Sequence, residues 1–283
     1  MSKIRMTAGE IKEEIEEIRN LDLAKIPFEE VFEKIRRLMI NGYEIRSFPG
    51  RHNFVYRARK TSERINNLSQ IWALDPAKVV LYGRANWLGF SVFYCADSCE
   101  VAIEEIHPKV GDLITVIKCR NINAKNMSAI SFGFHDNSRL IFSNGNSINL
   151  LEHREAALDM DEDSLEKNKI IDLFFNSIFR DNDKLVCSYG DYRYKITAAL
   201  AKMYLDNPNS DSSRLDCICY PSVSSKNNAT NYAIINDYAC EYLTPDSFWR
   251  FEIRDEILNN PSALRLINSA REVDTDKTIL WDK

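Results

Sequence analysis

Five residues of this 283-residue sequence could together perform chemistry. Arg57 lies in a β-rich run and Arg84 lies between two glycines, and a planar guanidinium binds phosphate or carboxylate through two parallel hydrogen bonds. Tyr94 offers an aromatic ring, Glu105 a carboxylate and Ser222 a hydroxyl. Such a set could hold an anionic ligand and stabilise a positive charge that develops during a reaction.

Each of these residues also has an ordinary explanation. Arg57 alternates with Arg59, so the two side chains share one face of the expected strand, and arginines on an edge strand are usually solvated. A tyrosine at the end of a strand usually belongs to the core, and glutamate is common on helix surfaces. A site is therefore indicated only by the whole set and its order.

The usual signatures of nucleotide and metal sites do not occur in the sequence. It has no GxGxxG or GxxxxGK[ST] phosphate loop, no HExxH zinc motif and no GxSxG nucleophile elbow. The four histidines stand apart, without metal-ligand spacing. Asp159, Asp161 and Asp163 alternate as in a calcium loop, but Ser164 stands where that loop requires glycine. We therefore expect no metal site.

Residues 1–48 are predicted to form a helical extension that precedes the main domain. Thr7 and Glu10 have the spacing of a capping box at the start of a first helix. A second helix is expected to begin at Pro27 and to end at Gly42, where glycine would take the left-handed capping conformation. Both helices are amphipathic, so they must pack on their own domain, on a second copy or on a partner protein.

Short apolar runs rich in β-forming residues follow from residue 53 onward. The predicted strands cover residues 54–56, 79–82, 90–95, 113–119, 129–134, 140–142, 215–220 and 232–235. A short helix with Asp97 as its N-cap is expected after the third of these strands. Longer helices are predicted near 163–180 and 191–205.

The last part of the chain is predicted to be helical, with helices near 237–243 and 251–258 and another after Pro261. Strands and helices do not alternate strictly enough for a doubly wound parallel sheet, which favours the α+β class. We divide the chain into an N-terminal helical extension (1–48), a main domain (49–250) with a helical insertion around 121–205, and a C-terminal helical tail (251–283).

Taken in order, these pieces resemble the RES-domain family, the toxin half of RES–Xre toxin–antitoxin pairs. That family has an aromatic-Arg strand, a Gly-Arg-aromatic-Asn-x-x-Gly turn, a Tyr-x-Ala strand end, an Ala-x-x-Glu helix and a late Pro-Ser followed by an Asn. The matching segments here are Tyr56-Arg57, Gly83–Gly89, Tyr94–Ala96, Ala102–Glu105, Tyr220–Ser222 and Asn231. The turn departs from the pattern, because Ala85 replaces the usual aromatic residue and Trp87 follows two places later.

The resemblance implies an α+β fold like that of ADP-ribosyltransferases of the diphtheria-toxin type, with a split β-sheet core and surrounding helices. It implies an enzyme that cleaves the nicotinamide–ribose bond of NAD, which would be a substrate, with no metal and no bound cofactor. The residues implied to bind NAD are Arg57, Arg84, Tyr94, Ser222 and Asn231, and those implied to take part in catalysis are Glu105, Arg57 and Ser222.

Helix geometry distinguishes Glu105 from its neighbour Glu104. Glu104 lies one turn after Glu100, which makes a like-charged stripe that belongs in solvent. Glu105 lies three and four residues after Ala102 and Val101, small and apolar positions that would face the sheet. Spacing and resemblance therefore both select Glu105 as the residue of the pocket.

Three functions remain open at this level. The chain could be an NAD glycohydrolase or phosphorylase that acts as a toxin and is neutralised by an antitoxin of the Xre, helix-turn-helix type. It could instead be an ADP-ribosyltransferase that modifies a specific protein target. It could also be a catalytically silent binding module. The acceptor of the ADP-ribosyl group could be water, phosphate or a protein side chain, and the chain could form a homo-oligomer.

Composition limits the other partners. Apolar residues make up 45% and charged residues 28% of the chain, as in an ordinary globular protein. The net charge of −5 argues against direct binding of nucleic acid, because neutralising phosphates requires a surplus of Lys and Arg. We expect no signal peptide, no membrane span and reduced buried thiols for the seven cysteines, which form no CxxC pair. These features predict a cytoplasmic protein.

Overall fold

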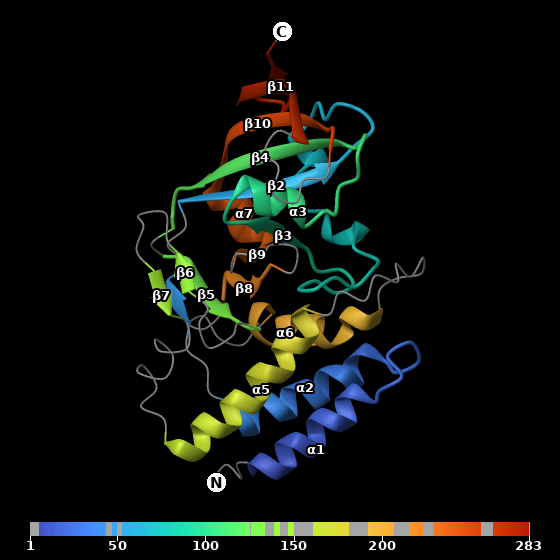
Figure 1. Cartoon of the computed structure of the whole chain (residues 1–283), viewed down its shortest axis with the longest axis vertical. Coiled ribbons are helices and arrows are strands. Elements are labelled where there is room, and N and C mark those ends of the chain that lie inside the picture. The colour runs from blue at the N-terminus through green and yellow to red at the C-terminus, as the bar shows by residue number, and fades with distance from the viewer. Residues whose placement is uncertain are drawn as a thin grey trace.

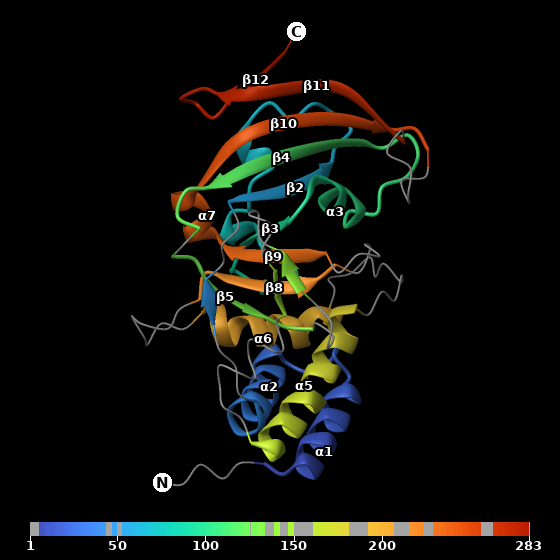
Figure 2. The same cartoon turned by 60° about the vertical axis from the view of Figure 1, so that its left-hand side comes forward.

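The structure is a computed structural model, which describes residues 6–43, 47–49, 53–124, 126–133, 139–141, 147–149, 161–180, 192–206, 215–222, 229–255 and 263–282. The molecule is elongated, with a layer of helices at the N-terminal end and a long sheet that extends to the C-terminal end (Figures 1 and 2). Among the described residues, no helix has the length and apolar character needed to cross a membrane.

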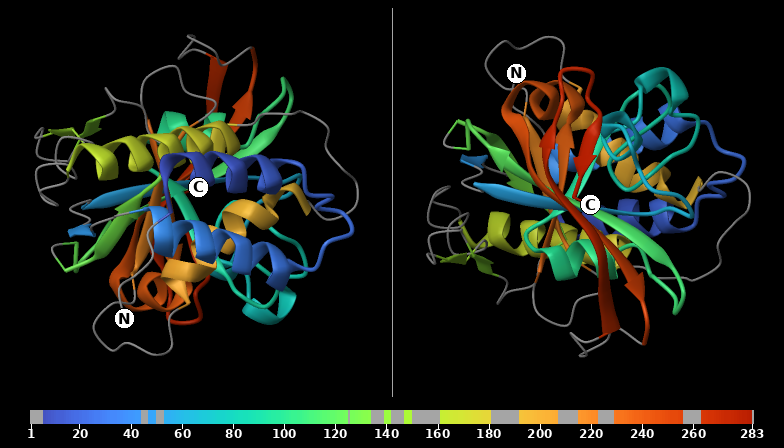
Figure 3. Two further views of the ribbon diagram at one scale, coloured as in Figure 1. Left: turned by 90° about the horizontal axis from the view of Figure 1, so that it is seen from below. Right: turned by 90° about the horizontal axis from the view of Figure 1, so that it is seen from above.

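A ten-stranded mixed sheet forms the centre of the fold, and neighbouring strands are antiparallel except for β5 and β8. Viewed along the length of the molecule, the sheet is strongly twisted (Figure 3). Its strands are, in spatial order, β1 (Phe48–Pro49), β5 (Ser128–Ser131), β8 (Cys217–Pro221), β9 (Thr230–Ile235), β3 (Val92–Ala96), β2 (Phe54–Lys60), β4 (Leu113–Asn121), β10 (Leu243–Ile253), β11 (Leu264–Val273) and β12 (Ile279–Trp281). A separate two-stranded sheet contains β6 (Arg139–Ile141) and β7 (Ser147–Asn149). The predicted α+β class is confirmed.

The sheet nearly divides between β2 and β3. Every residue of β2 is paired with β4, and every residue of β3 is paired with β9. Between β2 and β3 themselves, only Tyr56 and Ala96 are partners. The two ladders therefore diverge from this single point, and a space opens between strands that are neighbours in the sheet.

In the described part of the chain, four helices cover one end of the sheet: α1 (Ala8–Arg19), α2 (Phe28–Gly42), α5 (Glu162–Arg180) and α6 (Lys195–Leu205). They share one hydrophobic core with β3, β5, β8 and β9. The Tyr43 hydroxyl donates a 2.5 Å hydrogen bond to Asp172, and Lys195 Nζ donates to the carbonyls of Leu23 and Ile26. The N-terminal extension therefore packs on its own chain, against the later helices that the sequence placed in an insertion.

The expected helical insertion at 121–205 is only partly helical. β5 belongs to the main sheet and is paired with β8, and the helices in the described part of this segment are α5, from Glu162, and those that follow it. The predicted strand at 79–82 is wrong, because these residues pair with no strand; Val79 is buried, but Val80 is 71% and Leu81 54% exposed. A β-forming composition does not make a strand where no neighbouring strand supplies hydrogen bonds.

The C-terminal tail was predicted as helix and is instead a β-meander. β10 extends through residue 253, and β11 and β12 pair in succession with antiparallel register. The residues of β11 are mostly exposed or half-buried, so they lack the alternating apolar face that marks a strand in sequence. The helix predicted at 237–243 is confirmed as α7 (Asn236–Tyr242). Residues 256–262 lie outside the described residues.

Two helix caps test the local predictions. The capping box of Thr7 and Glu10 is confirmed, with both reciprocal hydrogen bonds present. Gly42, however, is not a left-handed cap but the last residue of α2. A side chain there would lie 2.8 Å from Ile11 Cδ1 and 3.2 Å from Ile171 Cδ1. Glycine is therefore needed for close packing of three helices rather than for chain reversal.

Candidate active site

A cavity of about 400 Å³ lies where β2 and β3 diverge. This volume is within the range of small-molecule sites in proteins. The residues that line it come from β2 in one half of the sheet, from β3, β9 and β8 in the other half, from a turn and from two helical segments. They are Tyr56, Arg57, Ala58, Gly83, Arg84, Tyr94, Cys95, Ala96, Ala102, Glu105, Ile106, His107, Tyr194, Tyr220 and Asn231.

Glu105 is placed by the end of the short helix α3 (Cys99–Glu104), which follows β3. Ser98, not the expected Asp97, caps this helix by accepting a hydrogen bond from the Val101 amide. Asp97 instead accepts from the Thr230 amide and ties β3 to β9. The residue after Ile106, His107, has a positive φ of 45° that ends the helical path. Glu105 therefore lies in the last turn, with its carboxylate directed toward the cavity.

Ser222 and Arg84 both contact the Glu105 carboxylate. The Ser222 hydroxyl donates a 2.5 Å hydrogen bond to Oε1, and Arg84 Nη1 lies 3.6 Å from Oε2. Ser222 is 4% exposed and is not among the residues that line the cavity. It follows β8 and is fixed by the bond from its amide to the Ala229 carbonyl. Ser222 thus orients Glu105 from behind, in the protein interior.

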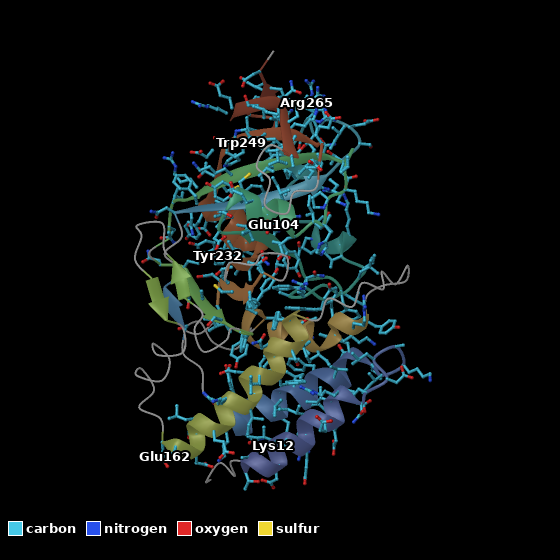
Figure 4. The ribbon with its side chains drawn as sticks, viewed as in Figure 1. Lys12, Glu104, Glu162, Tyr232, Trp249 and Arg265 are labelled. Atoms are coloured by element: carbon cyan, nitrogen blue, oxygen red, sulfur yellow. The ribbon has the colours of Figure 1, made fainter. Side chains whose placement is uncertain are left out.

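Glu104 is directed away from the cavity, although it is half-buried and not fully solvated. Figure 4 labels Glu104 and Tyr232 in the central part of the molecule, between the helical end at Lys12 and the sheet end at Trp249. Burial, Glu105 and Glu100 each raise the pKa of Glu104. Val101 and Ala102 are buried against Tyr56 and Ala58 of β2, as the helix spacing predicted.

Arg57 bridges the gap between the two halves of the sheet. Its Nε donates to the Ile71 carbonyl at 2.8 Å, and Nη1 donates to the Tyr94 carbonyl of β3 at 2.9 Å. Its guanidinium carbon also lies 5.3 Å from the centre of the Phe93 ring. Burial lowers the pKa of Arg57, but a guanidinium remains charged at neutral pH. Arg57 is also one of the residues that line the cavity.

Arg84 is presented by a turn rather than by a strand. Its guanidinium faces Glu105 and lies 5.9 Å from the centre of the Tyr220 ring. Burial alone would lower the pKa of Arg84, but Tyr220, Glu105 and Tyr194 outweigh it, and the pKa is raised. Ala85 beside it is fully buried, and Trp87 stacks on Phe90 outside the cavity.

Asn231 lies on β9 between Tyr220 of β8 and Ala96 of β3. Its side chain is 3% exposed, and its amide nitrogen has no hydrogen-bond partner among the described residues. An unpaired buried donor costs about 1–3 kcal/mol unless something satisfies it. A ligand in this cavity could accept that hydrogen bond.

Among the lining residues that were not predicted as site residues, those with an aromatic or imidazole side chain are Tyr56, His107, Tyr194 and Tyr220. Tyr56 and Tyr220 lie within the matched motifs, so adjacency to Arg57 and Ser222 was an available signal. Tyr194 lies in the short helix η3 (Tyr192–Tyr194), far along the chain from the other residues, and no local pattern marked it. Among the described residues, no cluster of His, Cys, Asp or Glu could hold a metal ion.

Comparison with known protein families gives a match. The model of the family described as "RES domain" matches residues 54–254, which contain every residue of the cavity. A comparison with curated proteins gives no match. The matched range leaves out α1 and α2 and most of the β-meander at the C-terminal end.

Proposed function

The chain belongs to the RES-domain family, and from this premise we propose that it is an enzyme that consumes NAD by breaking the nicotinamide–ribose bond. The observation that carries the proposal is the Glu105 carboxylate, held in the cavity wall by Ser222 and Arg84. In the proposed reaction, the bond between the ribose C1′ and the nicotinamide nitrogen breaks. Its electron pair neutralises the positive ring, and the ribose becomes an oxocarbenium-like cation.

A fixed carboxylate beside the ribose favours this cation over the ground state, because the positive charge grows at the carbon as the bond breaks. The acceptor then adds to C1′. With water, its oxygen forms the new bond and one proton is released. Because Glu105 is already oriented by Ser222, little reorganisation is needed when the charge develops.

The fixed charges around the cavity also suit NAD. Among the described lining residues, these are Arg57, Arg84 and Glu105, two positive charges and one negative. NAD carries two negative charges on its pyrophosphate and one positive charge on nicotinamide. We therefore infer that the arginines serve the pyrophosphate, while Glu105 serves the ribose next to the cationic ring. The rings of the lining tyrosines offer faces for nicotinamide or adenine.

The test is to incubate the purified chain with NAD and to follow free nicotinamide and labelled protein. Glu105→Gln keeps the shape and removes the charge, so we expect turnover to fall by about 10²- to 10³-fold. Glu104→Gln is the matched control, and we expect it to retain most of the activity because Glu104 does not line the cavity. Equal losses in the two variants would overturn the role of Glu105.

The same assay separates the alternatives. Release of nicotinamide without labelled protein supports a glycohydrolase or phosphorylase, and added phosphate distinguishes those two by the product. Labelling of a protein target supports an ADP-ribosyltransferase. No release and no labelling would leave a binding module and would overturn the proposal.

We also propose that this activity is toxic and is neutralised by an antitoxin of the Xre type. Expression of the unaltered chain should stop growth, whereas Glu105→Gln should not. Coexpression of a small helix-turn-helix protein encoded beside it should restore growth. Normal growth on expression of the active enzyme would contradict the toxin proposal.

A further inference from the structure

The hydroxyl of Tyr94 makes two hydrogen bonds within the protein. It accepts a 2.8 Å hydrogen bond from the Ala85 amide and donates a 2.9 Å hydrogen bond to Oδ1 of Asn86. Burial raises the pKa of Tyr94, so the hydroxyl keeps the proton that it donates. Both bonds are made to the turn that carries Arg84, which lies directly before Ala85.

Asn86 closes the same turn from the other side. Its Nδ2 donates to the Leu81 carbonyl at 2.9 Å, and its carbonyl accepts from the Gly83 amide at 3.1 Å. A side chain at Gly83 would lie 2.2 Å from Asn86 Oδ1 and 3.0 Å from Tyr94 Oη. The turn is thus closed so tightly around the tyrosine hydroxyl that only glycine fits at its start.

Tyr94 itself is held firmly. It lies in β3, which is paired along its whole length with β9, and its carbonyl accepts a hydrogen bond from Arg57. Leu81, by contrast, is 54% exposed, as expected in a surface loop. Strand β3 therefore fixes the loop through the Tyr94 hydroxyl, which bonds the loop at Ala85, next to Arg84.

We propose that Tyr94 is a positioning residue, whose hydroxyl fixes the Gly83–Asn86 turn so that the Arg84 guanidinium stands beside Glu105. Asn86 is the second residue that fixes this turn. This inference deepens the proposed function and depends on that function only for the role of Arg84 in binding the substrate. The family resemblance implied that Tyr94 binds NAD, whereas the positioning role belongs to its hydroxyl.

Tyr94→Phe is the direct test, because it keeps the ring and removes both hydrogen bonds. We expect amide hydrogen exchange at Ala85 to accelerate by at least about tenfold, while exchange at Ile117 in β4 stays unchanged. Tyr82→Phe is the matched control. Tyr82 lies two residues before Arg84, its ring packs on Phe28, and its hydroxyl has no hydrogen bond in the described part of the chain. Unchanged protection of Ala85 in Tyr94→Phe would overturn the proposal.

A double-mutant cycle tests whether Tyr94 acts through Arg84. We expect Tyr94→Phe to lower kcat/KM for nicotinamide release by roughly tenfold, mainly by raising KM. In an Arg84→Ala background, the same change should cost less than about twofold, because the residue being positioned is gone. A loss of equal size in both backgrounds would mean that Tyr94 acts independently of Arg84, and it would overturn the proposal.

A second variant and a measurement made without NAD keep the positioning role of Tyr94 testable. If Tyr94→Phe does not fold, Asn86→Ala is used instead, because it removes the Asn86 side-chain hydrogen bonds that fix the turn. It should accelerate amide exchange at Ala85 in the same way. Its effect on kcat/KM should likewise shrink in the Arg84→Ala background. If the unaltered chain releases no nicotinamide, the proposed function fails. Exchange at Ala85 still decides whether Tyr94 fixes the turn, because it is measured without NAD.

Discussion

The two arginines of the cavity belong to regions of opposite character. Arg57 is part of the strand wall, where its guanidinium donates to the main-chain carbonyls of Ile71 and Tyr94. Arg84 is part of the Gly83–Gly89 turn, and its guanidinium faces the side chains of Glu105 and Tyr220. Arg57 thus links β2 to β3 beside their single paired position, and Arg84 faces a carboxylate that lines the cavity.

A charged residue that lines a cavity can therefore also stabilise the fold. Carbonyl groups left without partners in the interior cost free energy, so Arg57 stabilises the split sheet even when the cavity is empty. Arg84 faces a carboxylate at 3.6 Å, longer than a good hydrogen bond. An anionic ligand can therefore recruit Arg84 with little loss to the protein.

The largest effect is expected from Arg57→Met, which leaves two buried carbonyls without a donor. We expect a loss of about 2–5 kcal/mol of unfolding free energy and a fall in Tm of roughly 5–15 °C. Arg59→Met is the matched control, since Arg59 shares the strand but is exposed. Denaturant unfolding of both variants measures the difference. Equal stability of the two would remove the bridging role of Arg57.

A smaller effect on stability is expected from Arg84→Met. We expect unfolding free energy to change by less than about 2 kcal/mol, because Ser222 still holds Glu105 and the turn is closed by Tyr94 and Asn86. KM for NAD should instead rise by about 10- to 100-fold, as for a lost charge-assisted hydrogen bond. Steady-state kinetics and unfolding curves of one preparation give both values. A loss of stability equal to that of Arg57→Met would erase the contrast between the two regions.

The smallest effect, a small change in Tm, is expected from Glu104→Gln. Glu104 is next to Glu105, the carboxylate that Arg84 faces. Burial, Glu105 and Glu100 raise the pKa of Glu104 in the folded protein above its ordinary value of 4.5. As pH rises, the Glu104 carboxyl therefore loses its proton in the unfolded chain before it does so in the folded protein. The folded protein is stabilised relative to the ionised state while Glu104 is protonated, and this contribution is lost as pH rises from the unfolded pKa through the folded pKa. Glu104→Gln should thus raise Tm slightly at pH 7 and leave it unchanged below pH 4.5. Thermal unfolding at both pH values measures this, and a lower Tm at pH 7 would contradict it.

Local chemistry in the sequence was sufficient for several features. The capping box at Thr7, the inward side of α3 at Val101 and Ala102, and the choice of Glu105 over Glu104 all depend on residues within one helical turn. These predictions agree with the structure because helix periodicity fixes which side chains share a face. The order of motifs along the chain likewise identified the family that the comparison shows.

Long-range pairing decided the rest. Residues 264–273 form a strand because β10 offers a paired edge, although their own pattern shows no strand period. Residues 79–82 have a strand composition and no such edge. Similarly, nothing near Tyr194 in the sequence shows that it lines the same cavity as Arg84.

By itself, the sequence determined the α+β class and the family, and it predicted a group of residues most of which line one cavity. Only the tertiary structure decided what each of them does. It placed Arg57 across the split in the sheet, moved Ser222 behind Glu105 and used the Tyr94 hydroxyl to close a turn. The physical reason is that hydrogen bonds and ion pairs act over a few ångströms in space, whatever the separation along the chain. A residue's type states which bonds it can make, and the fold selects its partners.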